Sequence, residues 1–253
     1  MGYDLQKAGF WKRIAAWMFD GILTGILAVG LGLILSALLG YDGYNQTLEA
    51  AYDHYETEYG IVFQISQEAY EAMTDAQRLN YDAAYAALIA DEPAMRAYNM
   101  VISLSMVITS VGILLAVLIW EFFVPLWLGN GQTLGKKIFG LCLMRNDGVK
   151  VNNLQLFART VLGKFAVETM IPVYILLMLF WGSVGLPATL LLLALVAAQV
   201  LCIALSHENC AIHDFLAGTV VVDMNSQMIF RTTEDLIAYK KKVAAEQAAR
   251  QTY

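Results

Sequence analysis

Three carboxylates interrupt long apolar stretches of this sequence, and their positions could support chemistry. Asp20 is the only ionisable residue between Ile14 and Leu39. Glu121 and Glu168 lie seven or eight residues inside later apolar stretches. If these stretches cross a bilayer as helices, each carboxylate lies about 10 Å below a membrane surface, at about 1.5 Å of rise per residue. A charge at the bilayer centre costs roughly 2.5 to 3.5 kcal/mol on insertion scales, so such residues usually have a partner or a role in moving ions or protons.

Basic side chains accompany these carboxylates along the chain. Arg13 precedes Asp20 by seven residues, or about two helical turns, so both lie on one helix face. The long Arg13 stem can run along that face, or it can carry the guanidinium up to the lipid headgroups. Lys164 and Glu168 are four residues apart, so they can pair on one face of a helix.

Carboxylates that share a low-dielectric site hold protons more tightly, which suits exchange of protons against a cation. The candidate ion or proton sites are four carboxylates, and their candidate charge partners are three basic side chains: Asp20, Glu121, Glu168 and Asp214, with Arg13, Lys164 and His213. The alternative is structural, a polar cluster that holds four helices in register. Both interpretations stay open at this point.

Other kinds of site are not indicated. The Gly-rich run Gly131–Gly140 lacks the Walker spacing, and Lys136 is not followed by Ser or Thr, so nucleotide binding is not expected. His207 and His213 are six residues apart, whereas the zinc-protease helix requires four. The three cysteines show no CxxC spacing and should pack as small apolar residues. We therefore predict no metal, no cofactor and no catalytic residues, and we expect that the protein is not an enzyme.

Four apolar stretches must position the candidate residues. The chain has 253 residues, 58% of them hydrophobic, and its mean hydropathy of +0.55 lies outside the range of ordinary soluble domains. About 20 apolar residues suffice to cross a bilayer. The predicted membrane helices are Ile14–Leu39, Tyr98–Leu128, Thr160–Phe180 and Val184–Leu205. The first is too long for a signal-peptide core and should be retained. Gly182 and Pro187 flank the break between the last two helices, which should form a hairpin.

The charge distribution predicts the orientation of these helices. Residues 41–97 contain eleven acidic residues and two arginines, a net charge of −9, whereas the whole chain carries −6, so the remainder carries +3. Basic residues near the helix ends lie before the first helix, between the second and third, and after the fourth. By the positive-inside rule both termini and the middle loop are cytoplasmic, and residues 41–97 are extracytoplasmic. We therefore predict a multi-pass protein of a bacterial cell membrane.

The acidic, Tyr-rich insert is expected to form two or three short amphipathic helices. Thr74 and Gln77 have the spacing of a capping box, which predicts a helix toward Ala90. Pro93 suits the first turn of the helix that leads into the second span. The insert could be a binding lid or a docking surface. The alternative is a solvated ornament whose tyrosines lie at the headgroup level.

The cytoplasmic segments are expected to be small. The middle loop predicts a β-hairpin over Leu141–Val151 that turns at Asp147 and Gly148, and Val220–Val222 could add a third strand. Lys136 and Lys137 are expected to meet anionic lipid headgroups. A Lys-bearing amphipathic helix should follow Thr232. The chain thus divides into residues 1–40, 41–97, 98–128, 129–159, 160–205 and 206–253, which makes it an all-α membrane protein with four transmembrane helices and a short hairpin.

Three stretches together resemble the RDD family of small bacterial membrane proteins. They are the Arg13-x6-Asp20 spacing at the first span, the run Gly131-Gln-Thr-Leu-Gly-Lys-Lys137 after the second, and the run His213-Asp-Phe-Leu-Ala-Gly-Thr219 after the last. The family is named for an Arg and two Asp, which by motif position are Arg13, Asp20 and Asp214. The resemblance covers the chain apart from the insert and the C-terminal helix. The long insert departs from the short connection common in the family.

The resemblance implies a multi-span protein with one of two functions. Some members resemble cation/proton antiporters, which agrees with a transporter that exchanges protons for cations or a small solute. Others resemble partners of membrane proteases, which favours a non-transporting accessory or regulatory subunit that binds another membrane protein. Four helices enclose little volume, so a transporter of this size is expected to be an oligomer. No nucleic-acid partner is expected.

Overall fold

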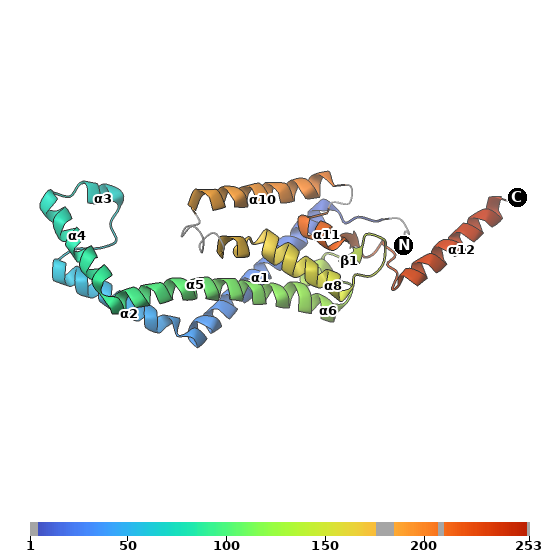
Figure 1. The fold of residues 1–253 in the computed structure, drawn as a ribbon. Coiled ribbons are helices and arrows are strands. Elements are labelled where there is room, and N and C mark those ends of the chain that lie inside the picture. The colour runs from blue at the N-terminus through green and yellow to red at the C-terminus, as the bar shows by residue number, and fades with distance from the viewer. Residues whose placement is uncertain (1–4, 176–184, 207–209, 252–253) are drawn as a thin grey trace. The chain divides into compact units, whose positions relative to one another are not determined.

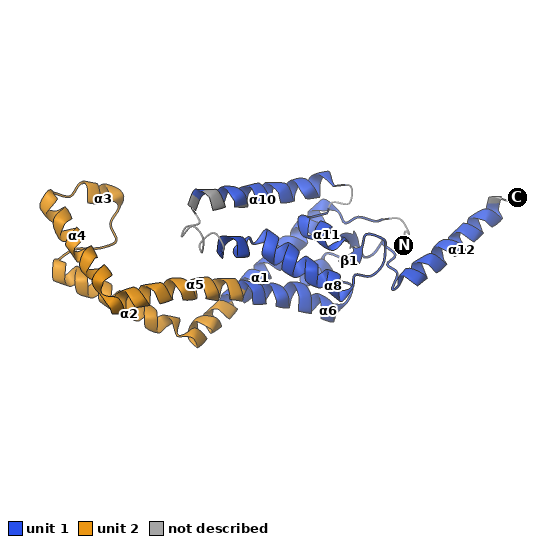
Figure 2. Cartoon of the chain, in the orientation of Figure 1, with its two compact units in different colours: residues 1–29, 113–253 blue, residues 30–112 orange. Residues whose placement is uncertain are grey.

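The computed structural model describes residues 5–175, 185–206 and 210–251 (Figure 1). These residues form two compact units, drawn in different colours in Figure 2. Unit 1 comprises residues 1–29 and 113–253, and unit 2 comprises residues 30–112. Regular structure in the described residues is mostly helical, with one small two-stranded sheet.

Two helices among the described residues are long and apolar enough to cross a membrane. Helix α1 spans Phe10–Leu39, with 30 residues, and an 18-residue window within it has a mean hydropathy of 2.5. Helix α5 (Glu92–Leu118) continues through the π-helix η1 (Ile119–Phe123) into α6 (Val124–Leu128). This run has 37 residues, and an 18-residue window within it has a mean hydropathy of 2.6. The ends of these runs at residues 39 and 128 agree with the first two predicted spans.

The third predicted span differs from a single α-helix. Residues Ala158–Glu168 form a π-helix, η2. The left-handed backbone of Met170 (φ 55°) then separates η2 from a new helical segment that begins at residue 171. Pro172 explains this break, because it lacks a backbone N–H and suits the first turn of a helix. The last part of this predicted span, and the break near Gly182, lie outside the described residues. Helix α10 (Gly185–Leu205) lies within the fourth predicted span.

Unit 2 holds the predicted helices of the insert. These are α2 (Tyr41–Tyr59), α3 (Gln67–Glu71) and α4 (Asp75–Ala90). The capping box predicted at the start of α4 is present, because the Thr74 hydroxyl accepts from the Gln77 amide while the Gln77 side chain accepts from the Thr74 amide. Phe63 packs edge-on against the rings of Tyr52, Tyr81 and Tyr85, which holds the loop after α2 against α4.

The sheet of unit 1 is antiparallel and buried. Strand β1 (Leu141–Arg145) pairs with β2 (Thr219–Asp223), with Leu141 opposite Asp223. The stretch predicted as an additional strand is therefore the main partner of β1. The turn predicted at Gly148 is present, since its amide donates to the Arg145 carbonyl. The returning arm is not a strand and forms isolated bridges, Lys150 with Met144 and Val149 with Phe230. The remaining helices of unit 1 are α7 (Leu134–Ile138), α8 (Asn153–Phe157), α11 (Ile212–Ala217) and α12 (Thr233–Gln251).

Candidate functional site

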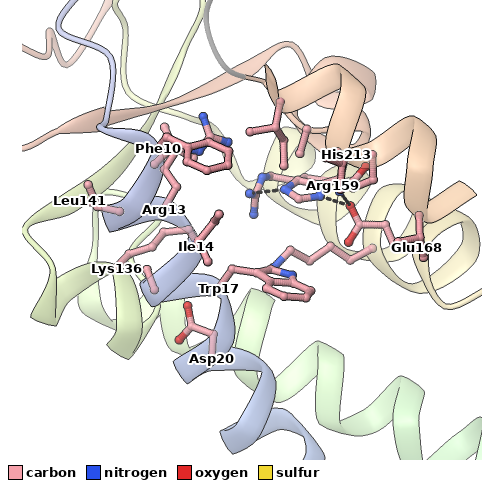
Figure 3. Close-up of a pocket in the computed structure, with 18 of the residues that line it drawn as sticks. Phe10, Arg13, Ile14, Trp17, Asp20, Lys136, Leu141, Arg159, Glu168 and His213 are labelled. Carbon is pink, nitrogen blue, oxygen red and sulfur yellow. Dashed lines mark hydrogen bonds and ion pairs between the residues drawn. The ribbon is translucent and has the colours of Figure 1, made fainter. Parts of the chain in front are cut away.

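Unit 1 contains a cavity of about 370 Å³ whose wall combines charged and apolar side chains (Figure 3). Helices α1, α7, η2, α10 and α11 and both strands contribute to it. Its ionisable lining residues come from segments far apart in the sequence: Arg13, Asp20, Lys136, Arg159, Lys164, Glu168 and His213. With Glu121 and Asp214, which lie behind this wall, they form what we call the charge network.

Asp214 is the acceptor at one end of the charge network. The Arg13 Nη2 atom lies 2.7 Å from Asp214 Oδ2, and Arg159 Nε lies 3.0 Å from Oδ1. The carboxylate is fully buried and also accepts from the Ala211 amide at the start of α11. Burial alone would raise the pKa of Asp214, but the charges of Arg159 and Arg13 and the hydrogen bond from the Ala211 amide hold it well below its usual range. One carboxylate is therefore shared between two guanidinium groups.

His213 lies between a cation and a carboxylate, and this fixes its tautomer. Its Nε2 atom is 2.7 Å from Arg159 Nη2, and its Nδ1 atom contacts the Glu168 carboxylate (Figure 3). A guanidinium has only donors, so Nε2 must accept and Nδ1 must carry the proton toward Glu168. Asp214 Oδ1, 3.5 Å from Nε2, and Glu168 favour protonation. Burial and the nearby Arg159 charge nevertheless lower the pKa of His213 below its ordinary value. The imidazole is therefore neutral at pH 7.

A glycine allows this close approach. A Cβ atom on Gly163 of η2 would lie 2.5 Å from the Cβ of His213 and 2.8 Å from its Cα. Real side chains do not tolerate such distances, so α11 packs against η2 through the bare backbone at this position. The position of His213 between Arg159 and Glu168 consequently depends on Gly163.

Glu121 is the acceptor for the amines. Its carboxylate contacts Lys164 directly, and its Oε2 atom lies 3.6 Å from Lys136 Nζ and 3.9 Å from Arg159 Nη1. Burial lowers the pKa of Lys136 to about 8, with the charges of Lys164 and Arg159 acting in the same direction and Glu121 opposing them. Lys136 thus joins α7 to the π-helical segment that carries Glu121.

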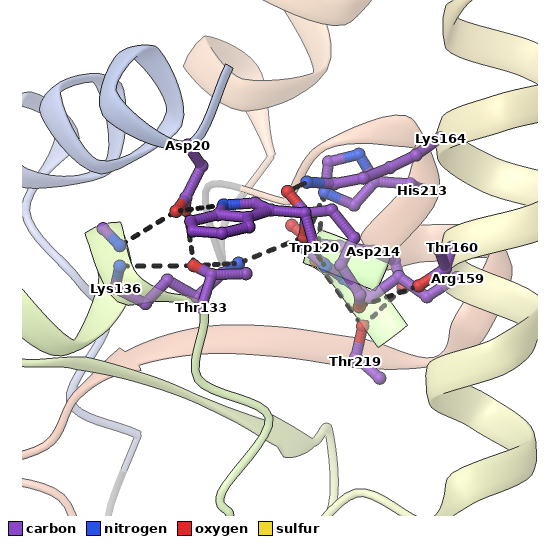
Figure 4. Close-up of polar contacts among 12 residues, drawn as sticks. Asp20, Trp120, Thr133, Lys136, Arg159, Thr160, Lys164, His213, Asp214 and Thr219 are labelled. Carbon is purple, nitrogen blue, oxygen red and sulfur yellow. Dashed lines mark hydrogen bonds and ion pairs between the residues drawn. The ribbon is translucent and has the colours of Figure 1, made fainter. Parts of the chain in front are cut away.

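Asp20 accepts hydrogen bonds from neutral donors rather than from a cation (Figure 4). Its Oδ2 accepts from the Thr133 hydroxyl, and its Oδ1 accepts from the Gly135 amide at 2.8 Å and from Trp120 Nε1 at 3.3 Å. A Cβ atom on Gly135 would lie 2.6 Å from the Ala16 carbonyl oxygen and 2.8 Å from the Asp20 carboxylate. The Gly-rich motif therefore lets α7 approach α1 closely enough for Asp20 of α1 to accept hydrogen bonds from the first turn of α7.

The predicted site residues are brought together, but their pairing differs from the expected one. Arg13 was expected either to run toward Asp20 or to reach the headgroups, and instead it is buried and paired with Asp214. Lys164 pairs with Glu121 rather than with its helix neighbour, while Glu168 contacts His213. These pairs join residues 43 to 201 positions apart in the sequence, a separation that periodicity along one helix does not reveal.

Other residues of the site were not identified from the sequence. Arg159 contacts three members of the charge network and is almost fully buried, yet it lies at the edge of an apolar stretch, where basic residues commonly face lipid headgroups. Lys136 is buried and faces Glu121, whereas Lys137 is exposed, so only Lys137 has the exposure that the predicted lipid contact requires. Thr133 could have been recognised, because its spacing to Lys136 matches an N-cap.

The charge network is balanced when His213 is neutral. Four cations face four carboxylates: Arg13, Lys136, Arg159 and Lys164, with Asp20, Glu121, Glu168 and Asp214. Within the described residues, no group of three or more His, Cys, Asp or Glu side chains is placed to hold a metal ion. His207, which the sequence places six residues before His213, is not among the described residues. The arrangement can take up one proton at His213 and gains one positive charge when it does.

The model of the RDD family matches residues 7–218 of this chain. No curated protein matches the chain, and neither does any solved structure.

Proposed function

The chain belongs to the RDD family, and from that premise we propose that this membrane protein carries a small anionic solute together with protons through the cavity of unit 1. The observation that carries the proposal is the position of His213 on the cavity wall, between Arg159 and Glu168. Histidine is the side chain whose ordinary pKa places its charge change near physiological pH. Because His213 contacts Arg159, a change in the charge of His213 alters the electrostatic environment of that guanidinium.

Protonation of His213 couples to binding of an anion through Arg159. A proton on Nε2 would point at Arg159 Nη2, replacing an attractive contact by the approach of two donors. Arg159 would then be held only by Asp214 and Glu121, and the network would carry one excess positive charge. An anionic solute restores neutrality. By linkage, an anion that binds the protonated form more tightly also makes protonation easier.

Cations fit this geometry less well, although the sequence also allowed exchange of protons for cations. Each carboxylate of the network already has partners: Asp20 accepts from three neutral donors, while the other three contact basic side chains. A metal cation would have to displace ammonium or guanidinium groups, since oxygen ligands are what it requires. We therefore propose an anion as the solute.

Uptake of radiolabelled butanesulfonate into proteoliposomes tests the proposal. A sulfonate stays ionised at all the pH values used, so any pH dependence reports on the protein. We expect an inward proton gradient to drive uptake, and we expect His213→Gln to abolish that dependence. His54→Gln is the matched control, because His54 is exposed in the insert and paired only with Glu58 along its own helix. The proposal would be contradicted if the proton gradient did not change the rate of uptake, or if His213→Gln showed the same dependence on the gradient as the wild-type protein.

The second candidate is a non-transporting accessory subunit, and the ion pairing within the charge network favours it. A network in which buried cations and carboxylates are paired can fasten α1, η1, η2 and α11 together without moving anything. The insert would then be a docking surface for another membrane protein. Shortening residues 44–90 to a Gly/Ser connector separates the two candidates. Loss of a co-purifying protein in that variant, with no uptake in either form, would favour the accessory role.

We also propose the orientation that the charge distribution predicts, with four spans, cytoplasmic termini and an extracytoplasmic insert. Cysteines introduced at Tyr59 and Ala83 of unit 2 should react with an impermeant thiol reagent added to intact cells, since Ala83 is exposed whereas its neighbour Ala84 is buried. A cysteine at Asn153, at the start of α8, should react only after the cytoplasmic face is opened. Reversed labelling would exclude this topology. Crosslinking in native membranes tests the proposed oligomer, for which capture of monomers alone would be the contrary result.

A further inference from the structure

We propose that the ligand of the cavity is an amphiphile with one anionic head group, which Arg13 binds while the apolar tail lies along α10. This inference rests on the proposed function and deepens it by naming the class of solute. Two independent observations carry it, the first at Arg13 and the second on the wall formed by α10.

The first observation is an unused donor. The Arg13 side chain is 9% exposed, and its Nη2 atom is engaged by Asp214. Its Nη1 atom is buried and has no hydrogen-bond partner among the described residues. Buried donors are normally satisfied, so an exception in a side chain that lines a cavity points to a ligand that supplies the acceptor.

The charge at this end of the cavity is also unequal. Among the described residues Asp214 is the single carboxylate that contacts Arg13, and Asp214 is shared with Arg159, whose other carboxylate, Glu121, lies farther away at 3.9 Å. At the other end Asp20 is a carboxylate held by neutral donors. The network is neutral in sum but positive beside Arg13, which favours an anion at Nη1 and opposes one near Asp20.

The second observation is the apolar wall. Eleven of the nineteen lining residues are apolar. Four of them lie on one helix, α10, and recur at the spacing of a helical face: Leu195, Val196, Val200 and Ile203. Phe10, Ile14 and Trp17 of α1 line the same cavity and lie close to Arg13 in Figure 3. A fully hydrophilic anion would leave this wall in contact with water, whereas a hydrocarbon tail covers it.

The size of the cavity limits the tail. A volume of about 370 Å³ lies within the roughly 300 to 1,000 Å³ typical of small-molecule sites. At about 30 Å³ for each water-sized group, it holds about a dozen such groups. A head group with a chain of about eight to ten carbons fills that space. Carboxylates, sulfonates and phosphate monoesters all offer the acceptor oxygens that a guanidinium binds, so a free amphiphile and a membrane lipid are both possible sources of the head group.

Equilibrium binding of radiolabelled decanesulfonate to the full-length protein in phosphatidylcholine nanodiscs tests the inference. Decanol presents the tail without charge, and methanesulfonate presents the head group without a tail. We expect saturable binding that neither compound displaces at equal concentration. Arg13→Lys keeps a cation for Asp214 but removes the free nitrogen, so it should weaken binding roughly 10- to 100-fold, the range for one hydrogen bond to a charged group.

A second pair of variants keeps the test independent of Arg13. Val200 lines the cavity, so the larger side chain of Val200→Trp should occupy part of the cavity volume and weaken binding. Leu193→Trp places the same side chain on an exposed position of α10 outside the cavity and should leave binding unchanged. Unchanged binding in Arg13→Lys and in Val200→Trp would overturn the inference. So would equal displacement by decanol, which would show that the charge is not recognised, or by methanesulfonate, which would show that the tail is not.

Repeating the measurement in phosphatidylglycerol nanodiscs identifies the source of the ligand. Loss of decanesulfonate binding there would show that an anionic membrane lipid occupies the site. Unchanged binding would assign the site to a free amphiphile. Because this assay needs no proton gradient, it can succeed when proton-driven uptake of butanesulfonate fails, and the two proposals are refuted separately.

Discussion

Replacing Asp20 by asparagine tests whether this carboxylate serves as an ionised acceptor that holds α7 against α1. The substitution keeps the size of the side chain but replaces one acceptor oxygen by a donor. In the structure all three partners of Asp20 are donors: the Thr133 hydroxyl, the Gly135 amide and Trp120 Nε1. We therefore expect Asp20→Asn to destabilise the protein.

Neither orientation of the new amide satisfies these partners. If the oxygen stays on Gly135 and Trp120, the amide nitrogen faces the Thr133 hydroxyl. The two acceptor positions of that hydroxyl are already taken by the backbone amide and the ammonium of Lys136, at 3.3 and 3.2 Å. If the amide is turned over, its nitrogen faces the Gly135 and Trp120 donors. At least one hydrogen bond to a charged group is lost in either case, and the smaller loss costs about 1.5 to 3 kcal/mol.

Thermal unfolding of the purified protein measures this loss. For a chain of this size 1 kcal/mol shifts Tm by about 2 to 4 °C, so Asp20→Asn should lower Tm by about 3 to 12 °C. Asp20→Ala leaves all three donors without this acceptor and should lower it further. Asp53→Asn makes the same chemical change at an exposed position of α2 and is the matched control.

An unchanged Tm in Asp20→Asn would refute the reasoning. It would show that the folded protein does not use Asp20 as an ionised acceptor. Asp20 would then again be a candidate for the proton site that the sequence suggested. Reduced uptake of the solute in a variant with normal Tm would support that assignment.

Two further predictions follow from the packing and the protonation of His213. Gly163→Ala should cost about 1 to 3 kcal/mol because its methyl group would overlap His213, whereas Gly21→Ala, with no neighbour within 4 Å, should be neutral or slightly stabilising in the same melting assay. Stability should also fall as the pH drops below about 6.5, since the lowered pKa of His213 leaves the unfolded chain binding the proton first, and the lowered pKa of Asp214 extends the loss below about pH 4. Melting curves between about pH 3 and 8 check this, with His213→Gln removing the upper part of the decline; a flat profile in the wild-type protein would contradict it.

Features that depend on neighbouring residues could be predicted from the sequence. The first apolar stretch was predicted to end at Leu39, and helix α1 ends there. The capping box of Thr74 and the turn at Gly148 form because each depends on atoms two to four residues apart. Asp20 and Glu121 could be singled out because an ionisable residue is costly inside an apolar stretch.

The partners of those residues could not be predicted, because they depend on the tertiary fold. Arg13 and Asp214 are 201 residues apart in the chain and meet only when α11 packs beside α1. Lys136 has the sequence surroundings of a lipid-facing lysine, and its burial follows from the close approach of α7 that Gly135 permits. A glycine and a threonine in a loop do not reveal, without the fold, which carboxylate they will meet.

The π-helices explain the remaining error, the expected pairing of Lys164 with Glu168. In an α-helix, residues four apart lie on one face, but the i→i+5 hydrogen bonds of η2 widen the turn, so that Arg159 and Lys164, five apart, lie closer to one face. Lys164 therefore faces Glu121, itself within the π-helix η1, and Glu168 is left to meet His213. The π-helix is rare in proteins and frequently occurs at functional sites. Its presence in both segments that carry the charge network argues that the fold gives up regular helix geometry here to place these side chains around the cavity.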